Sequence, residues 1–178
     1  MAGDRLDAPL PVLGFAAWSG TGKTTLLRQL IPLLRERGLR PAVVKHSHHS
    51  FDVDVPGKDS YELRKAGADQ VLVASRRRWA LMVETPEIEG DPDLAELLRH
   101  LDTTRADIVL VEGFRRVAFP KIELWRAALG KPLLFPEDGN VVAVATDGAL
   151  PVDTDLPVLD LNDAPEIAGF VRAFAARH

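Results

Sequence analysis

The sequence contains no cysteine among its 178 residues. A disulfide scaffold, a thiol nucleophile, a thiolate zinc site and a cysteine-ligated iron–sulfur cluster are therefore excluded. The sequence also lacks an apolar run of about 18 residues, the length that a helix needs to span a bilayer. Residues 1–9 are charged and contain proline, which is not typical of a signal peptide. We therefore expect a cytoplasmic protein that does not bind membranes.

A surplus of positive charge is missing as well. Lysine and arginine number 22 against 26 aspartates and glutamates, so the formal net charge is −4. This balance argues against a protein that coats nucleic acid. The hydrophobic fraction of 46% is sufficient for a packed core. The length fits one domain, so we expect residues 1–178 to form a single domain in which residues 1–9 are flexible.

Short apolar runs alternate with segments of helical period along most of the chain. This alternation is typical of βαβ units and predicts an α/β fold of three layers with a mostly parallel central sheet. Two further strand-like runs, joined by three arginines at 76–78, predict an additional β-hairpin. Strands are expected at 12–18, 40–45, 70–75, 79–85, 108–112, 121–126, 141–145 and 156–161, and helices at 23–37, 59–66, 92–101 and from 162 or 163 to 176.

The most specific motif occupies residues 17–25, between the first strand and the first helix. It matches the phosphate-binding loop (P-loop) at every fixed position except the first, where Ala17 replaces glycine. Its glycines allow successive backbone N–H groups to point at phosphate oxygens, and the helix N-terminus adds partial positive charge. The motif predicts a P-loop NTPase-like nucleotide-binding domain. The predicted nucleotide-binding residues are Ser19, Gly20, Thr21, Gly22, Lys23, Thr24 and Thr25.

A carboxylate suited to a metal ion is expected at Glu112. This residue ends the apolar run 108–112, and the carboxyl ends of parallel strands line the ligand crevice. Thr24 and Glu112 are therefore the predicted Mg²⁺ ligands. Lys23 would contact the β- and γ-phosphates, so Lys23 and Glu112 are predicted catalytic residues.

The end of the strand at 141–145 predicts which base is bound. Asp147 follows this strand, and its carboxylate can accept two hydrogen bonds from the N1–H and amino groups of guanine. Adenine lacks this donor pair on the same edge, so the sequence predicts GTP rather than ATP. Asn162, after the last strand, could complete the base pocket, although an N-cap role for Asn162 or Asp163 also fits.

The motifs resemble those of the MobB family, the molybdopterin-guanine dinucleotide biosynthesis proteins B. The resemblance runs from about residue 13 to about residue 174 and depends chiefly on segments outside the phosphate loop. In this resemblance, Lys23, Thr24 and Glu112 correspond to the family's Walker lysine, its threonine and its strand-end acid. The segments that carry the resemblance are 16–25, 45–49, 52–54, 56–67, 111–114 and 145–147.

The resemblance implies a role for the whole protein. Members of the family are P-loop proteins that bind GTP and Mg²⁺, have weak GTPase activity and form homodimers. They act as accessory or adapter partners of the guanylyltransferase MobA, which joins GMP to molybdopterin. We therefore expect GTP or GDP, MobA and molybdopterin itself as candidate partners.

Residues 45–58 are rich in ionisable side chains and lack periodicity. They fit a solvated loop, a switch loop ordered by the γ-phosphate, a loop that contacts pterin, or a metal site formed by histidines with an aspartate. In the switch interpretation, Asp52 or Asp54 orients the attacking water, and we include Asp54 among the predicted catalytic residues. The histidines are His46, His48 and His49.

Two other functions remain open from the sequence. The first is an ATP-dependent small-molecule kinase, or a ligase similar to dethiobiotin synthetase, whose strand-end Glu-Gly resembles Glu112-Gly113. Asp147 argues against this alternative because it favours guanine. The second is a structural adapter with a vestigial nucleotide pocket. Arg115 and Arg116 are candidates for an arginine finger by their proximity to Glu112 alone.

Overall fold

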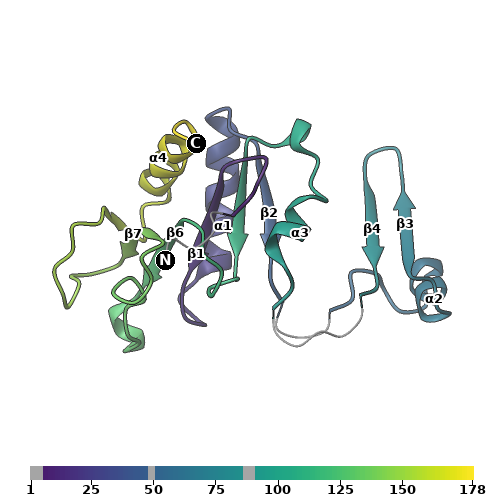
Figure 1. Ribbon diagram of the computed structural model, residues 1–178, viewed down its shortest axis with the longest axis horizontal. Helices are drawn as coiled ribbons and strands as arrows, with labels where there is room; N and C mark the ends of the chain where they lie inside the picture. Colours follow the sequence, from purple (N-terminus) through teal and green to yellow (C-terminus); the bar gives the residue numbers. More distant parts are fainter. Residues whose placement is uncertain (1–5, 48–50, 86–90) are drawn as a thin grey trace. The chain divides into compact units, whose positions relative to one another are not determined.

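The computed structural model describes residues 6–47, 51–85 and 91–178 (Figure 1). The chain divides into two compact units: the first comprises Met1–His46 and Asp93–His178, and the second comprises Ser47–Pro92. The expectation of one domain, which rested on length, stays a prediction. None of the helices in the described residues has the length and apolar character needed to cross a membrane.

The first unit contains a sheet of six strands in the order β2-β5-β1-β6-β7-β8, in which every neighbouring pair is parallel. The α/β fold with a parallel central sheet is thus confirmed. The chain leaves β1 toward β2 and leaves β6 toward β7, on opposite sides, and a reversal of this kind is where ligands commonly bind to open α/β sheets. The strands are β1 (Val12–Ala16), β2 (Pro41–Lys45), β5 (Ile108–Glu112), β6 (Lys121–Trp125), β7 (Val141–Thr146) and β8 (Val158–Asp160).

Helices cover both faces of this sheet. On one face, α1 (Lys23–Glu36) and α4 (Ala164–Ala175) pack against each other and against the sheet, and they bury the main hydrophobic core. On the other face, α3 (Leu94–Leu98) buries Leu94 and Leu98 in a second cluster. Short 3-10 helices occupy Thr103–Arg105 and Ala127–Leu129.

The α3 helix is shorter than the sequence predicted. Its N-cap is Asp93, whose Oδ1 accepts a hydrogen bond from the Ala95 amide at 2.8 Å. The sequence predicts a helix over 92–101, for which the preceding Asp91 would be the N-cap, and this was wrong because Asp93 accepts the first free amides instead. Both residues are plausible caps by type, and only the three-dimensional path of the chain distinguishes them.

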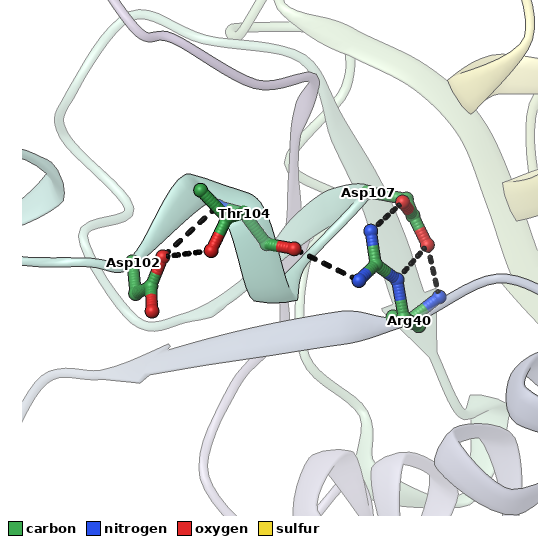
Figure 2. A network of polar contacts seen from close by, with 4 residues as sticks. All are labelled: Arg40, Asp102, Thr104 and Asp107. Carbon is green, nitrogen blue, oxygen red and sulfur yellow. Dashed lines mark hydrogen bonds and ion pairs between the residues drawn. The ribbon is translucent and has the colours of Figure 1, made fainter.

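An ion pair joins β2 to β5 at the end where both strands begin (Figure 2). The Arg40 guanidinium donates to both Asp107 carboxylate oxygens, at 2.9 and 2.6 Å, and to the Thr104 carbonyl at 2.9 Å. The main chains of the two residues are also linked, since the Asp107 amide donates to the Arg40 carbonyl at 2.8 Å. The edge strand β2 is therefore fixed in register against its neighbour β5.

The second unit contains α2 (Asp59–Lys65) and a two-stranded antiparallel sheet of β3 (Gln70–Ala74) and β4 (Trp79–Val83) (Figure 1). The additional hairpin predicted from the sequence is therefore confirmed. In its turn, the Ser75 amide donates to the Arg78 carbonyl at 2.7 Å.

Candidate functional site

The phosphate loop connects β1 to α1. Gly20 and Gly22 have φ of 84° and 101°, a left-handed conformation that favours glycine. Thr21 is buried, and its hydroxyl donates to the Trp18 carbonyl at 2.8 Å. In the described residues 6–47, 51–85 and 91–178, Phe114 alone among non-glycine residues has positive φ, so Ala17 occupies the first motif position without backbone strain.

The loop ends at the N-terminus of α1. Gly22 is the N-cap, and no side chain caps the first helical turn, which contains no acidic residue. The first amides of a helix have no partner within the helix, and its dipole favours an anion at this end. The backbone at 20–25 is therefore suited to an anion, and anion binding here stays a prediction of the motif.

The Lys23 ammonium group lies over the loop. Its Nζ donates to the carbonyls of Ala17 and Trp18, at 3.1 and 3.4 Å. Burial lowers the pKa of Lys23, the nearby Glu112 opposes this shift, and the neighbouring cations Lys45 and Arg115 add to it. Lys45 and Arg115 thus lie close enough to Lys23 to repel it, and a polyphosphate would relieve this repulsion.

Thr24 and Glu112 lie together, as the metal-site prediction requires. The Thr24 hydroxyl donates to Glu112 Oε1 at 3.0 Å, and Lys45 Nζ lies 3.4 Å from the same oxygen. Phe15 is the β1 partner of Glu112 in the parallel register, which brings the end of β5 beside the loop. A hydroxyl and a carboxylate are hard oxygen donors, and Mg²⁺ needs only one or two such protein ligands when phosphate oxygens and water supply the rest.

A tight turn after β5 fixes the position of Glu112. Gly113 has φ 101° and the buried Phe114 has φ 50°. The Phe114 ring lies 4.9 Å from the His46 ring, and the His46 amide donates to the Glu112 carbonyl at 2.8 Å. Positive φ at a phenylalanine is unfavourable and is found where surrounding packing enforces it, often at functional sites.

The predicted base-binding residues lie after two neighbouring strands. Thr146 of β7 pairs with Asp160 of β8, so Asp147 and Asn162 follow strands that end at one edge. Asn162 is exposed, and its backbone amide donates to Asp160 Oδ1 at 2.7 Å. Asp163, and not Asn162, caps α4, because its Oδ1 accepts the Glu166 amide at 2.9 Å.

Asp147 has a partner that sequence reasoning did not find. Arg126, just after β6, donates through Nη1 to Asp147 Oδ2 at 2.6 Å and through Nε to the Thr21 carbonyl at 3.0 Å. One guanidinium thus joins the predicted base-binding carboxylate to the phosphate loop. Arg126 is far from both residues in the sequence, so no local motif indicates this contact.

Asp54 belongs to the second unit, where Arg64 binds it. Arg64 Nη2 lies 2.7 Å from Asp54 Oδ1, and the same guanidinium pairs with Asp52 and Glu84. The hydrogen bond from Arg64 lowers the pKa of the Asp54 carboxyl. This arrangement supports a structural role for Asp54 within the unit, and its catalytic role stays a prediction.

The histidine cluster falls partly outside the described residues, which do not include His48 and His49. Among residues 6–47, 51–85 and 91–178, no group of three His, Asp or Glu side chains could hold a metal ion. The metal-site interpretation of these histidines therefore stays a prediction.

The known proteins that are similar to almost the whole of this chain point to one family. A family model described as Molybdopterin guanine dinucleotide synthesis protein B (MobB) matches residues 12–147. The Molybdopterin-guanine dinucleotide biosynthesis adapter protein of Escherichia coli (strain K12) is 53% identical over 172 residues, which are 96% of this chain and 95% of that protein.

Two further similarities extend over almost the whole chain. The protein of the same name from Haemophilus influenzae is 47% identical over 167 residues, covering 93% of this chain and 90% of that protein. A crystal structure described as molybdopterin-guanine biosynthesis protein B superposes with a TM-score of 0.69 at 28% identity, covering 91% of this chain and 98% of the other.

Proposed function

The chain belongs to the MobB family, and we propose that it is a GTP-binding adapter in the biosynthesis of molybdopterin guanine dinucleotide. The proposed nucleotide binding rests on one observation: Thr24, Glu112 and Lys23 interact with one another at the N-terminus of α1. The adapter part is supported by the name that the relatives at 53% and 47% identity carry.

In this proposal, the triphosphate lies on the loop amides with the Lys23 ammonium group against it. Thr24 and Glu112 would hold Mg²⁺, which neutralises charge on the phosphates during hydrolysis. The proposal assigns Lys23 and Glu112 to positioning and charge stabilisation. In the described part of the chain we assign no water-orienting side chain to this site, so the proposed GTPase activity is weak.

We propose that Asp147 selects guanine. Arg126 holds one carboxylate oxygen, Oδ2, and thereby fixes the orientation of the group. The N1–H and amino group of guanine would then donate to the carboxylate, whereas adenine offers no equivalent pair. Asn162, at the same edge of the sheet, is the proposed second side of the base pocket.

Calorimetric titration of GTP, GDP and ATP with Mg²⁺ into the wild type and Asp147→Asn tests the proposal. We expect GTP to bind more tightly than ATP, and the substitution to weaken GTP binding by about ten-fold or more, because hydrogen bonds to a charged group are lost. ATP affinity should not change. Asp155→Asn, which removes the same charge from an exposed carboxylate, should leave all three affinities unaltered.

Two outcomes favour the alternative functions. Equal or tighter binding of ATP would contradict guanine selection and favour the ATP-dependent kinase or ligase. If Lys23→Ala abolishes nucleotide binding but not the cellular function of the protein, the nucleotide pocket is vestigial and the protein is a structural adapter.

The proposed partners are a MobA-type guanylyltransferase, molybdopterin and a second copy of the chain, all in the cytoplasm. The homodimer is supported by the exposed apolar side chains of the β3–β4 hairpin, which include Leu72 and Trp79, with 62% and 59% of their surface exposed. Co-elution of the protein with the guanylyltransferase, with and without GTP, tests the adapter role. Absence of a complex under both conditions would contradict it.

A further inference from the structure

A cavity of about 550 Å³ opens in the first unit beside the phosphate loop. The loop contributes Trp18 to its lining, and the segment after β5 contributes Arg115 and Arg116. The opposite wall consists of residues 132–140, which precede β7. The nucleotide-binding residues described above, from Ser19 to Thr25, do not line it.

The loop side of the cavity presents an aromatic ring held in place. Trp18 Nε1 donates to the Pro132 carbonyl at 2.8 Å, which ties the indole to the opposite wall. The Arg115 guanidinium lies 4.5 Å from the centre of the Trp18 ring, a cation–π contact. Lys131 Nζ lies 5.9 Å from the same ring. The ring and the apolar side chains of Leu133 and Leu134 provide surfaces suited to a flat ligand.

Buried charged groups hold the opposite wall. Lys121, only 1% exposed, forms an ion pair with Asp138 at 2.9 Å, and Asp138 also accepts a hydrogen bond from Asn140. The fully buried Glu123 accepts the amides of Leu134 and Phe135, at 2.7 and 2.8 Å. The wall is therefore preformed, and the charges of Lys121 and Asp138 offset each other.

The charges that remain are mainly positive. Arg115 and Arg116 are exposed and, within the described ranges of the chain, make no hydrogen bond or ion pair through their side chains. Apart from the paired Lys121 and Asp138, Glu137 is the other charged residue that the described part of the chain contributes to the lining. Two guanidinium groups with free donors are well suited to a phosphate, which they can bind through paired N–H groups.

We propose that this cavity binds a planar aromatic compound that carries a phosphate group, as a second ligand beside the nucleotide. The ring packs against Trp18 and the leucines, and the phosphate pairs with Arg115 and Arg116. Because Arg115 also acts electrostatically on Lys23, the second ligand lies within reach of the charges at the nucleotide site. The inference deepens the proposed function by giving the adapter a second substrate class, but binding to the cavity is measurable independently of GTP.

Calorimetry with three probes distinguishes recognition of the aromatic ring from recognition of the phosphate group. The full chain, saturated with Mg²⁺ and a non-hydrolysable GTP analogue, is titrated with 2-naphthyl phosphate, 2-naphthol and inorganic phosphate. We expect one molecule of 2-naphthyl phosphate to bind per chain, and the other two probes to bind at least about ten-fold more weakly, because each lacks one of the two recognised groups. The analogue should not displace the probe.

Variants locate the bound probe. Arg116→Gln and Trp18→Ala should each weaken 2-naphthyl phosphate by about ten-fold, since one removes a charged donor and the other removes the ring contact. Arg172→Gln, which removes a charge from α4, is the matched control and should have no effect. Nucleotide affinity is measured on every variant, so that an altered phosphate loop is recognised.

Four results would overturn the inference, and three of them are seen with a probe that binds. These are equal affinity for 2-naphthol, unchanged affinity in Arg116→Gln, and displacement of the probe by the GTP analogue, which would place the probe in the nucleotide site. A chain that binds the probe but no nucleotide would contradict the proposed function and leave this inference standing. A chain that binds GTP but not the probe would contradict this inference and leave the proposed function standing.

Discussion

Glu123 shows how a single buried side chain shapes a region that the sequence marks only as a loop. It alternates along β6 with core residues, and its carboxylate accepts two backbone amides from residues 134 and 135. Burial raises the pKa of Glu123, and these hydrogen bonds oppose the shift. The native state therefore retains the proton to a higher pH than the unfolded chain, and this residue's contribution to stability falls as the pH rises above about 4.5.

We predict that Glu123→Gln destabilises the protein at neutral pH. The amide group of glutamine would direct N–H donors at one of the two backbone N–H groups, leaving a buried donor without an acceptor. The expected loss is about 1–3 kcal/mol in the free energy of unfolding, measured by urea denaturation. Glu137→Gln, an exposed position in the same loop, should change stability little. Equal effects of the two substitutions would show that the buried hydrogen bonds do not matter.

The residues of the candidate site differ in how far the sequence could predict them. The phosphate loop is a local pattern, so its residues and their closeness to the helix N-terminus followed from spacing alone. The contact of Thr24 with Glu112 needed only the rule that parallel strand ends meet. The link from Arg126 to Thr21 crosses 105 residues and has no motif, so only the folded chain shows it.

At the scale of elements, strands were easier to predict than the ends of helices. A buried parallel strand is a continuous apolar run, and all six strands of the main sheet occur where such runs were found. The ends of α3 depend on which of two nearby aspartates accepts the first free amides. That choice follows from the path of the preceding chain and is not encoded in residue type.

The Arg40–Asp107 ion pair predicts how acid affects the contact between β2 and β5. The hydrogen bonds from Arg40 lower the pKa of the Asp107 carboxyl to about 2. Because its pKa is lowered, the ionised Asp107 carboxylate stabilises the fold when the pH lies above the ordinary pKa of an aspartate. This stabilisation disappears as the pH falls from about 4 toward 2. Asp107→Asn should cost about 1 kcal/mol at neutral pH, a modest value because the pair is partly exposed.

Urea denaturation as a function of pH tests this expectation. The difference in unfolding free energy between the wild type and Asp107→Asn should shrink between pH 4 and pH 2. Asp155→Asn, exposed in the same unit, is the matched control for the change in net charge. A difference that stays constant over this range would contradict the assigned pKa.

The turn after β5 allows a second prediction at the scale of elements. An added Cβ at Gly113 would lie 2.7 Å from the His46 Cβ, and its φ of 101° is unfavourable for other residues. Gly113→Ala should therefore destabilise the protein by more than about 1 kcal/mol and weaken Mg²⁺-dependent nucleotide binding, because Glu112 is displaced. Gly139→Ala, whose Cβ would meet no atom within 4 Å, should do neither.

At the scale of the whole molecule, length and hydrophobic content predicted one domain, which stays a prediction, and did not indicate that the contacts would divide the chain into two compact units. The composition of residues 47–92 does not distinguish them from the rest. Their separation follows from contacts such as those of Arg64 with Asp52, Asp54 and Glu84, which link them to one another. Pairing choices of this kind cannot be deduced from a single sequence.

The hairpin of the second unit predicts the assembly of the protein. Val71 is buried, whereas Leu72 and its cross-strand partner Leu81 are 62% and 44% exposed, and they share a face with the exposed Trp79. A second copy of the chain would bury this face. We expect the wild type to sediment as a dimer and Leu72→Glu/Leu81→Glu as a monomer, because the charges oppose burial.

Arg77→Glu, in the turn of the same hairpin, is the control for added negative charge and should remain dimeric. Circular dichroism of each variant verifies that the fold is kept. If the double variant is folded and still dimeric, the hairpin face is not the contact between copies.

The position of β1 in the sheet has a consequence for how the chain folds during synthesis. Its two neighbours are β5 and β6, both encoded after residue 107, whereas β2 pairs only with β5. The first three elements therefore leave the ribosome without any strand partner. At about 5–20 residues per second, they wait on the order of several seconds for β5. During that interval the apolar runs of β1 and β2 are exposed, so the nascent chain is a natural client for holding chaperones, and the main sheet forms only when its second half emerges.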